Sequence, residues 1–180
     1  MPNFHIHKTE QLLGLTVHFF YKNGCGRLWR SKRSEPEGTA VDLLSAVSKQ
    51  KIEFSSHSGN LALMRKYVRR FLEPYPFSEK ERMLIVLGVD EACTNIIRYA
   101  YALRDDQLIS LSLEGLRGCV RIRLRDYGKQ ARKSALRGRS HDLIKPGGLG
   151  LHLIRNAFDK VDYNLKPRGT ELILTKNLAS

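Results

Sequence analysis

The chain has 180 residues, of which 42% are hydrophobic and 27% charged, with a formal net charge of +13 at pH 7. This composition is that of an ordinary globular domain, and it excludes a disordered or fibrous chain. No run approaches the roughly 18 consecutive apolar residues of a membrane span, and the N-terminus lacks the layout of a secretory signal. We therefore expect a cytoplasmic protein with no membrane partner.

The positive charge is concentrated in one stretch of the chain. Between residues 121 and 145, nine lysine and arginine residues stand against two aspartates. Such a block suits a nucleic acid, a nucleotide triphosphate, an acidic partner protein or a plain solvated loop. Because no recognition helix with base-reading residues is visible, direct nucleic-acid binding is the least favoured of these.

Residues 1–50 form an N-terminal extension of unclear structure. The alternation over 12–21 indicates a strand, 31–39 is typical of a linker, and 40–50 is compatible with a short helix. His5-x-His7 is more typical of solvated coil than of a metal site. An extra strand with an arm, a disordered extension and a segment outside the working protein all stay open.

Residues 51–178 carry a sharper pattern. We expect a strand near 52–56 and a helix over 60–72, capped by Ser58 or Asn60. A second helix opens with the capping box Ser78-x-x-Glu81 and runs to about Tyr101. The remaining predicted elements are strands 108–113 and 120–125, a helix over 149–160, and strands 161–165 and 170–176. The fold class is α/β, a two-layer sandwich of a mostly antiparallel mixed sheet with helices on one face.

Three motifs could carry chemistry. Glu91 and Asn95 fall one turn apart on one helical stripe, where an acid can accept a proton and an amide oxygen can ligate Mg²⁺. Asp126-x-Gly128 ends a strand, where a carboxylate can accept the amino group of adenine. A glycine-rich segment opens a helix, where backbone N–H groups attract phosphate; it comprises Lys145, Gly147, Gly148, Leu149 and Gly150. Taken singly, these motifs are also compatible with a solvated helix face, a strand-end turn and a hinge.

Together and in this order, the motifs resemble the nucleotide site of the GHKL superfamily, which has a Bergerat-type, histidine-kinase-like ATPase fold. Glu91-x-x-x-Asn95 resembles its N box, Asp126-x-Gly128 its first glycine box and Gly148-x-Gly150 its second. The segment 90–101, together with 147–154, resembles more narrowly the anti-sigma-factor serine/threonine kinase branch. The resemblance covers about residues 51–178.

The resemblance implies ATP and Mg²⁺ as cofactors. It makes Glu91 the catalytic residue that acts as, or orients, the base for the attacking hydroxyl, and Asn95 the metal ligand. It makes Asp126, supported by Gly128 and Thr170, the adenine-reading group, while residues 145–150 wrap the phosphates. Tyr99 and the pair Lys129-Gln130 depart from the family pattern.

The implied function is an anti-sigma factor that phosphorylates a small STAS-type antagonist protein and binds a sigma factor. The alternative is an ATP-binding sequestration module without turnover. A homodimer is compatible with the sequence.

Overall fold

The computed structural model describes residues 4–12, 15–22, 48–130 and 149–178. Its strands are β1 (Phe4–Leu12), β2 (Leu15–Lys22), β3 (Ser48–Ser55), β4 (Leu108–Leu116), β5 (Cys119–Arg125), β6 (Lys160–Leu165) and β7 (Thr170–Asn177). Its helices are α2 (Asn60–Leu72), α3 (Glu79–Asn95) and α5 (Leu149–Ala157), and a π-helical turn, η1 (Ile96–Ala100), continues α3 directly.

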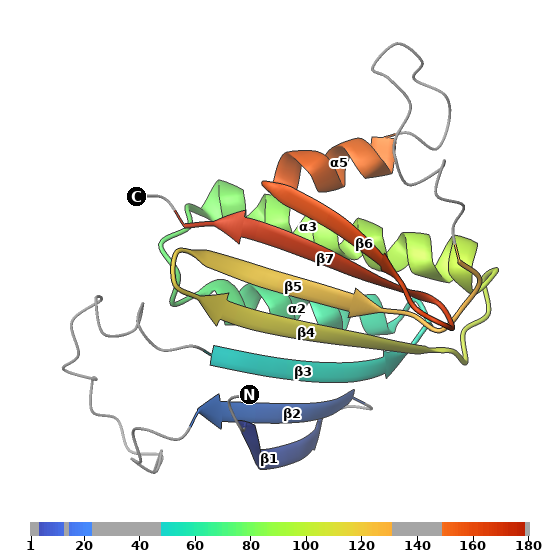
Figure 1. The fold of residues 1–180 in the computed structure, drawn as a ribbon, viewed down its shortest axis with the longest axis horizontal. Helices are drawn as coiled ribbons and strands as arrows, with labels where there is room; N and C mark the ends of the chain where they lie inside the picture. The colour runs from blue at the N-terminus through green and yellow to red at the C-terminus, as the bar shows by residue number, and fades with distance from the viewer. Residues whose placement is uncertain (1–3, 13–14, 23–47, 131–148, 179–180) are drawn as a thin grey trace.

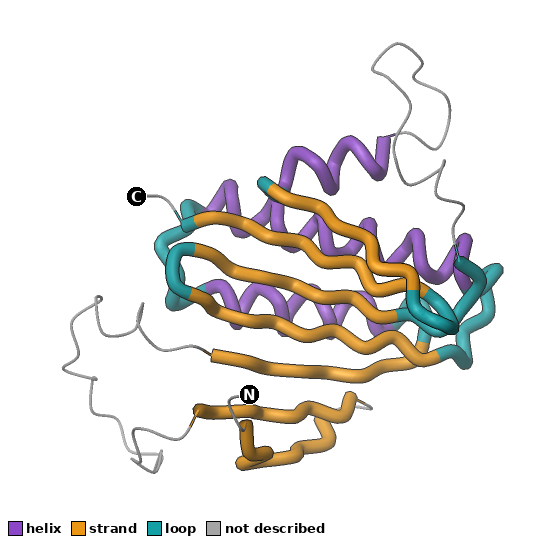
Figure 2. The backbone as a smooth tube through the Cα atoms, in the orientation of Figure 1, coloured by secondary structure: helices purple, strands orange, loops and turns teal. Residues whose placement is uncertain are grey.

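The strands form one sheet in the order β1-β2-β3-β4-β5-β7-β6, and the helices gather on one side of it (Figures 1 and 2). This arrangement confirms the predicted two-layer α/β sandwich. Every pairing among the described strands is antiparallel, so the parallel pair that a mixed sheet would contain is not found there. Among the described residues, no helix combines the length and apolar character needed to cross a membrane.

The N-terminal extension contributes two strands to this sheet. β2 pairs with β3, with Val17 opposite Ile52, and β1 adds a further strand at the edge (Figure 1). The strand predicted over 12–21 corresponds to β2, and β1 is a further strand that was not predicted. The helix predicted over 40–50 is wrong for Ser48 to Gln50, because pairing with strands on both sides overrides a weak local helical pattern. Residues 23–47, including the predicted linker, lie outside the described residues.

The first two helices begin and end close to their predicted bounds. α2 spans Asn60–Leu72, but its predicted cap is wrong: Gly59 is the N-cap, and Asn60 instead donates to the backbone oxygen of Ser55 at 3.1 Å. The capping box of α3 is confirmed. Ser78 Oγ accepts from the Glu81 N–H at 3.2 Å, and the Glu81 carboxylate accepts from the Ser78 N–H at 2.8 Å.

The core lies between the sheet and the helices. Alternate residues of β4 and β5 are fully buried, and they meet buried residues of α2 and α3. The fully buried residues of β4 and β5 are Ile109, Leu111, Leu113, Val120, Ile122 and Leu124. Each such side chain stabilises the fold by about 2 kcal/mol relative to exposure.

The opposite face of the sheet carries charge, and along β5 the arginines alternate with the buried apolar residues. There Glu114 is 8% exposed, and its carboxylate lies 3.0 Å from Lys49 Nζ and 3.4 Å from Arg123 Nε. The sheet thus has one apolar face that positions the helices and one solvated face.

Candidate functional site

Glu91 and Asn95 lie one turn apart on α3, and both are partly buried. The Glu91 side chain reaches the first turn of α5, since a Cβ atom built on Gly150 would stand 1.8 Å from Glu91 Oε1. Glycine therefore lets α5 approach the carboxylate more closely than any other residue would. The start of a helix carries partial positive charge, which favours a neighbouring carboxylate. The structure thus brings Glu91 of the predicted N box against Gly150 of the predicted second glycine box, whereas Arg98, one turn beyond Asn95 along the chain, is exposed.

A second glycine, which the sequence analysis missed, helps to hold α3 and α5 close together. A Cβ atom on Gly88 would stand 2.8 Å from Phe158 Cε2 and 2.9 Å from Ala157 Cβ. Figure 1 shows α5 beside α3, and the two helices share extensive contacts. The available signal was a glycine inside a helical pattern, which marks a close approach between elements.

Asp126 lies at the end of β5 and is 4% exposed. Its Oδ1 accepts from the Gly128 N–H at 3.0 Å, and its Oδ2 accepts from the Thr170 N–H at 3.2 Å. Burial raises the pKa of the Asp126 carboxyl above its usual value, and the two backbone N–H groups oppose that shift. The structure therefore gathers Asp126, Gly128 and Thr170, as predicted, around one carboxylate in a fixed orientation.

Two glycines allow this close packing around Asp126. A Cβ atom on Gly128 would stand 2.3 Å from the backbone oxygen of Ala100, at the end of η1. Gly169 has a φ of +73°, and a Cβ atom there would stand 2.1 Å from the backbone oxygen of Asp126. Both obstacles are backbone atoms, which cannot move aside as a side-chain tip can. Gly169 lay in a turn that the sequence predicted, but its contact with Asp126 was not foreseen.

Arg125 is one of the nine basic residues between 121 and 145, and in the structure it hydrogen-bonds to the Asp126 turn. Its guanidinium donates to the backbone oxygens of Asp126, Thr170 and Arg168, the second of these at 3.1 Å. The same group lies 4.5 Å from the ring centroid of Tyr127. One cation thus ties the end of β5 to the turn between β6 and β7.

The predicted continuous helix up to Tyr101 ends in the π-helical turn η1. The Tyr101 N–H donates to the Ile96 oxygen at 3.0 Å, five residues earlier. Its side-chain hydroxyl accepts from the Tyr127 N–H at 2.9 Å and donates to the Leu108 oxygen. Single π-turns are frequent at functional sites, but local sequence periodicity does not reveal them.

The glycine-rich segment is described only from Leu149 onward. Lys145, Gly147 and Gly148 lie outside the described residues, as does most of the basic loop. Leu149 is the first residue of α5, and Gly150 follows it against Glu91. The position of the predicted phosphate-wrapping segment relative to Asn95 therefore stays a prediction.

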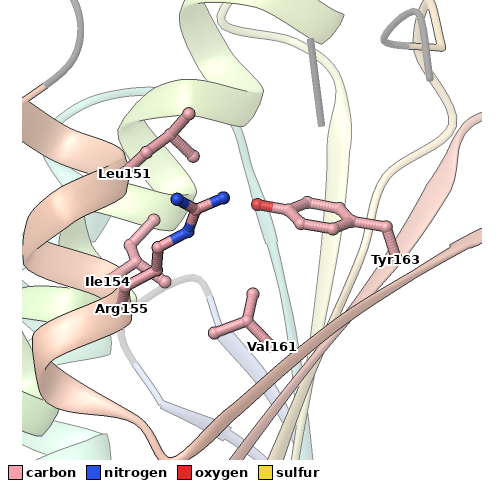
Figure 3. A pocket seen from close by; sticks show the side chains of 5 residues that line it. All are labelled: Leu151, Ile154, Arg155, Val161 and Tyr163. Carbon is pink, nitrogen blue, oxygen red and sulfur yellow. The ribbon is translucent and has the colours of Figure 1, made fainter. Parts of the chain in front are cut away.

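A small cavity of about 60 Å³ lies between α5 and β6 (Figure 3). Leu151, Ile154 and Val161 form its apolar lining, and the Arg155 guanidinium and the Tyr163 hydroxyl point toward one another across it. Of the predicted site residues that the structure describes, none lines this cavity. It is far smaller than the several hundred Å³ of a pocket for a small-molecule ligand.

The described residues fit an adenine nucleotide with Mg²⁺ in two respects. Each Asp126 carboxylate oxygen accepts one backbone N–H, and such an oxygen can accept a second hydrogen bond. Asn95 supplies an amide oxygen one turn from Glu91, and Mg²⁺ that is bound mainly by phosphates and waters needs only one or two protein oxygens.

Residues 54–176 match the sequence model of the histidine kinase-like ATPase domain family. The match covers more than half of the chain, so the chain belongs to this family. This confirms the predicted superfamily and its Bergerat-type fold.

Two curated proteins are similar to the chain. The serine/threonine-protein kinase BtrW of Bordetella bronchiseptica is 32% identical over 108 residues, which cover 57% of this chain and 75% of that protein. The anti-sigma F factor of Clostridium novyi is 26% identical over 140 residues, which cover 74% of this chain and 96% of that protein.

A solved structure of the RsbU and RsbW domains of a Mycobacterium tuberculosis protein is also similar. It superposes with a TM-score of 0.48 at 17% identity and covers 72% of this chain. The chain spans only 33% of the length of that solved protein.

Proposed function

We propose that this protein is an ATP- and Mg²⁺-dependent serine/threonine protein kinase that acts as an anti-sigma factor and phosphorylates a small STAS-type antagonist. The contact between Glu91 and Gly150 carries this proposal, because it sets a carboxylate against the first turn of a glycine-led helix. The printed names of the two curated relatives, a serine/threonine-protein kinase and an anti-sigma F factor, support it.

When bound, ATP with Mg²⁺ supplies the phosphoryl group that is transferred. Glu91 accepts the proton of the serine or threonine hydroxyl as that oxygen attacks, or orients the hydroxyl for attack. Asn95 would hold the metal ion through its side-chain oxygen. The backbone N–H groups at the start of α5 hold phosphate oxygens, which Gly150 allows to come close.

The adenine end of the site is proposed to lie at Asp126. Its carboxylate accepts the exocyclic amino group of the base, and Gly128 and Thr170 hold that carboxylate in place. Lys145, Gly147, Gly148 and Leu149 would close over the phosphates. The local excess of positive charge suits this role, since ATP brings about four negative charges.

None of the departures from the family pattern replaces the buried Asp126 carboxylate. Tyr99 is 64% exposed, so its side chain faces solvent. Lys129 contributes its backbone N–H to the Ala100 oxygen at 2.9 Å, and the Gln130 amide donates to the Gly169 oxygen at 3.2 Å. Both contacts hold the turn that contains Gly128, which argues for an intact adenine site.

The proposed partners are a sigma factor and its antagonist. The proposed location is the cytoplasm, where ATP and both partners are found. Residues 51–178 would form the kinase domain. Residues 1–50 would be an extension whose strands lengthen its sheet. A homodimer is the oligomeric state to test first.

Transfer of radiolabelled phosphate from ATP to a purified antagonist tests the proposal. Glu91→Ala should reduce transfer by about 10²–10⁴-fold, the usual contribution of a positioned acid or base. Asp90→Asn is the matched control, because it removes the adjacent carboxylate, which pairs with Arg65 at 2.8 Å on α2. Transfer that persists in Glu91→Ala would remove Glu91 from the mechanism.

The same assay separates the kinase from the sequestration module. ATP binding and sigma-factor capture without transfer or hydrolysis would indicate that module. Absence of ATP binding in the wild-type protein would refute both functions.

A further inference from the structure

Tyr101 is a buried residue beside the candidate site that has no part in the mechanism above. It is 4% exposed and follows η1 directly. Its hydroxyl accepts from the Tyr127 N–H at 2.9 Å and donates to the Leu108 oxygen. One phenol thus joins the end of the N-box helix, the start of β4 and the turn that contains Asp126.

The backbone around Tyr101 has an unusual shape. The residues after it, Ala102 and Leu103, both have positive φ angles, +52° and +65°. Such angles are uncommon for residues with a side chain, and they persist where surrounding contacts hold them. Here the Leu103 N–H donates to the Ile97 oxygen at 2.8 Å, which ties the turn back to η1.

The Asp126 turn is held against this segment at two points. The Tyr127 N–H donates to the Tyr101 hydroxyl, and the Lys129 N–H donates to the Ala100 oxygen at 2.9 Å. Gly128 lies between the two bonds, with its Cα against the Ala100 carbonyl. Burial raises the pKa of the Tyr101 hydroxyl, so it stays protonated and can donate and accept at once.

We propose that Tyr101 is a positioning residue that fixes the orientation of Asp126 and thereby sets the preference for adenine over guanine nucleotides. This inference rests on the proposed function. Adenine presents an amino group where guanine presents a carbonyl oxygen, so a fixed carboxylate accepts from the first and repels the second. If the turn were loose, the carboxylate could rotate away, and discrimination would weaken.

Tyr101→Phe tests this role because it keeps the ring and removes the hydroxyl. Two tyrosines provide matched controls. Tyr75 is also buried, and its hydroxyl lies 2.8 Å from Ser48 Oγ, so Tyr75→Phe removes a comparable hydrogen bond elsewhere in the fold. Tyr99 lies two residues from Tyr101 and is 64% exposed, so Tyr99→Phe should change little.

Two measurements report the effect. The ratio of the dissociation constants for GTP and ATP should fall about tenfold in Tyr101→Phe, since one hydrogen bond contributes about that factor. In the nucleotide-free protein, hydrogen exchange at the Tyr127 amide should accelerate about tenfold, because that N–H loses its acceptor. Both controls should keep the wild-type ratio and the wild-type exchange rate at Tyr127.

An ATP-selective wild type and an equally selective, folded Tyr101→Phe would overturn the inference and leave the proposed function standing. An equal loss of selectivity in Tyr75→Phe would also overturn it, since the effect would then follow general stability. A wild-type protein that binds neither nucleotide would refute the proposed function and this inference together.

Discussion

The two ends of the candidate site are built in different ways. At one end, two backbone N–H groups hold the Asp126 carboxylate, and Arg125 and Tyr101 both hydrogen-bond to its turn. At the other end, the tip of the flexible Glu91 side chain rests against Gly150. The first carboxylate is fixed by the backbone, whereas the second is placed by the approach of a helix.

This difference matches the work that each end is proposed to do. Recognition of a base requires donors and acceptors at constant positions. Phosphoryl transfer requires a proton-accepting group within hydrogen-bond reach of the attacking hydroxyl. Substitution of Gly169, at the Asp126 end, should therefore lower stability. Substitution of Gly150, at the Glu91 end, should instead lower activity.

The largest effect is expected for Gly169→Ala. The new Cβ atom would stand 2.1 Å from the Asp126 oxygen, at a residue whose φ is +73°. We expect a loss of about 3 kcal/mol in the free energy of unfolding, together with loss of ATP binding. Urea denaturation and calorimetric titration measure the two quantities.

Gly118→Ala is the control for this substitution. Gly118 has a similar φ of +81°, but a Cβ atom there meets nothing within 4 Å. It should cost about 1 kcal/mol and leave ATP binding intact. If the two variants behaved alike, backbone strain rather than the contact with Asp126 would explain the effect.

An intermediate effect, on activity rather than stability, is expected for Gly150→Ala. The methyl group would displace the Glu91 carboxylate, whose side chain can swing aside, so the free energy of unfolding should change by less than about 1 kcal/mol. The rate of phosphate transfer should fall about 100-fold through misplacement of the acid. In a Glu91→Ala background the same change should add no further loss. A further loss there would show that Gly150 acts through another group.

The smallest effect concerns the pH dependence of stability at Asp126. Burial raises the pKa of this carboxyl, so the folded protein holds the proton more tightly than the unfolded chain does. The resulting stability is present at low pH and is lost as the pH rises above 3.8 and through the folded pKa. Relative to Asp126→Asn, the wild type should therefore gain stability as the pH falls from 7 to 4, measured by urea denaturation.

Asp106 offers a control of opposite sign. Hydrogen bonds from Gln107 and Arg104 lower the pKa of its carboxyl. Relative to Asp106→Asn, the wild type should lose stability as the pH falls through that lowered pKa. If the stability of the wild type relative to Asp126→Asn and relative to Asp106→Asn changed with pH in the same direction, the causes assigned to the two pKa shifts would be wrong.

Much of the fold follows from local sequence. The apolar spacing of residues 60–72 and the Ser78 capping box specify two helices, and the alternation of β4 and β5 specifies a sheet with one buried face. The residues gathered at Asp126 were predicted from the resemblance, because each belongs to a short motif.

The remaining features depend on contacts between distant segments. The sequence around Tyr101 gives no sign that its hydroxyl accepts from the Tyr127 N–H, which lies 26 residues away along the chain. Likewise, the sequence around Arg125 gives no sign that it donates to the Thr170 oxygen, 45 residues away. The hairpin of β1 and β2 was missed as a pair for the same reason. Its place is set by pairing with β3 and not by its own periodicity.

The place of β7 in the sheet also constrains synthesis of the protein. β7 is the last described strand in chain order, yet it lies between β5 and β6 and supplies the Thr170 N–H that holds Asp126. In a nascent chain on the ribosome the sheet is therefore incomplete, and the Asp126 carboxylate lacks the Thr170 N–H, until residues 170–177 emerge. If Asp126 reads the base as proposed, a chain truncated before β7 should bind ATP more weakly than a chain that includes β7.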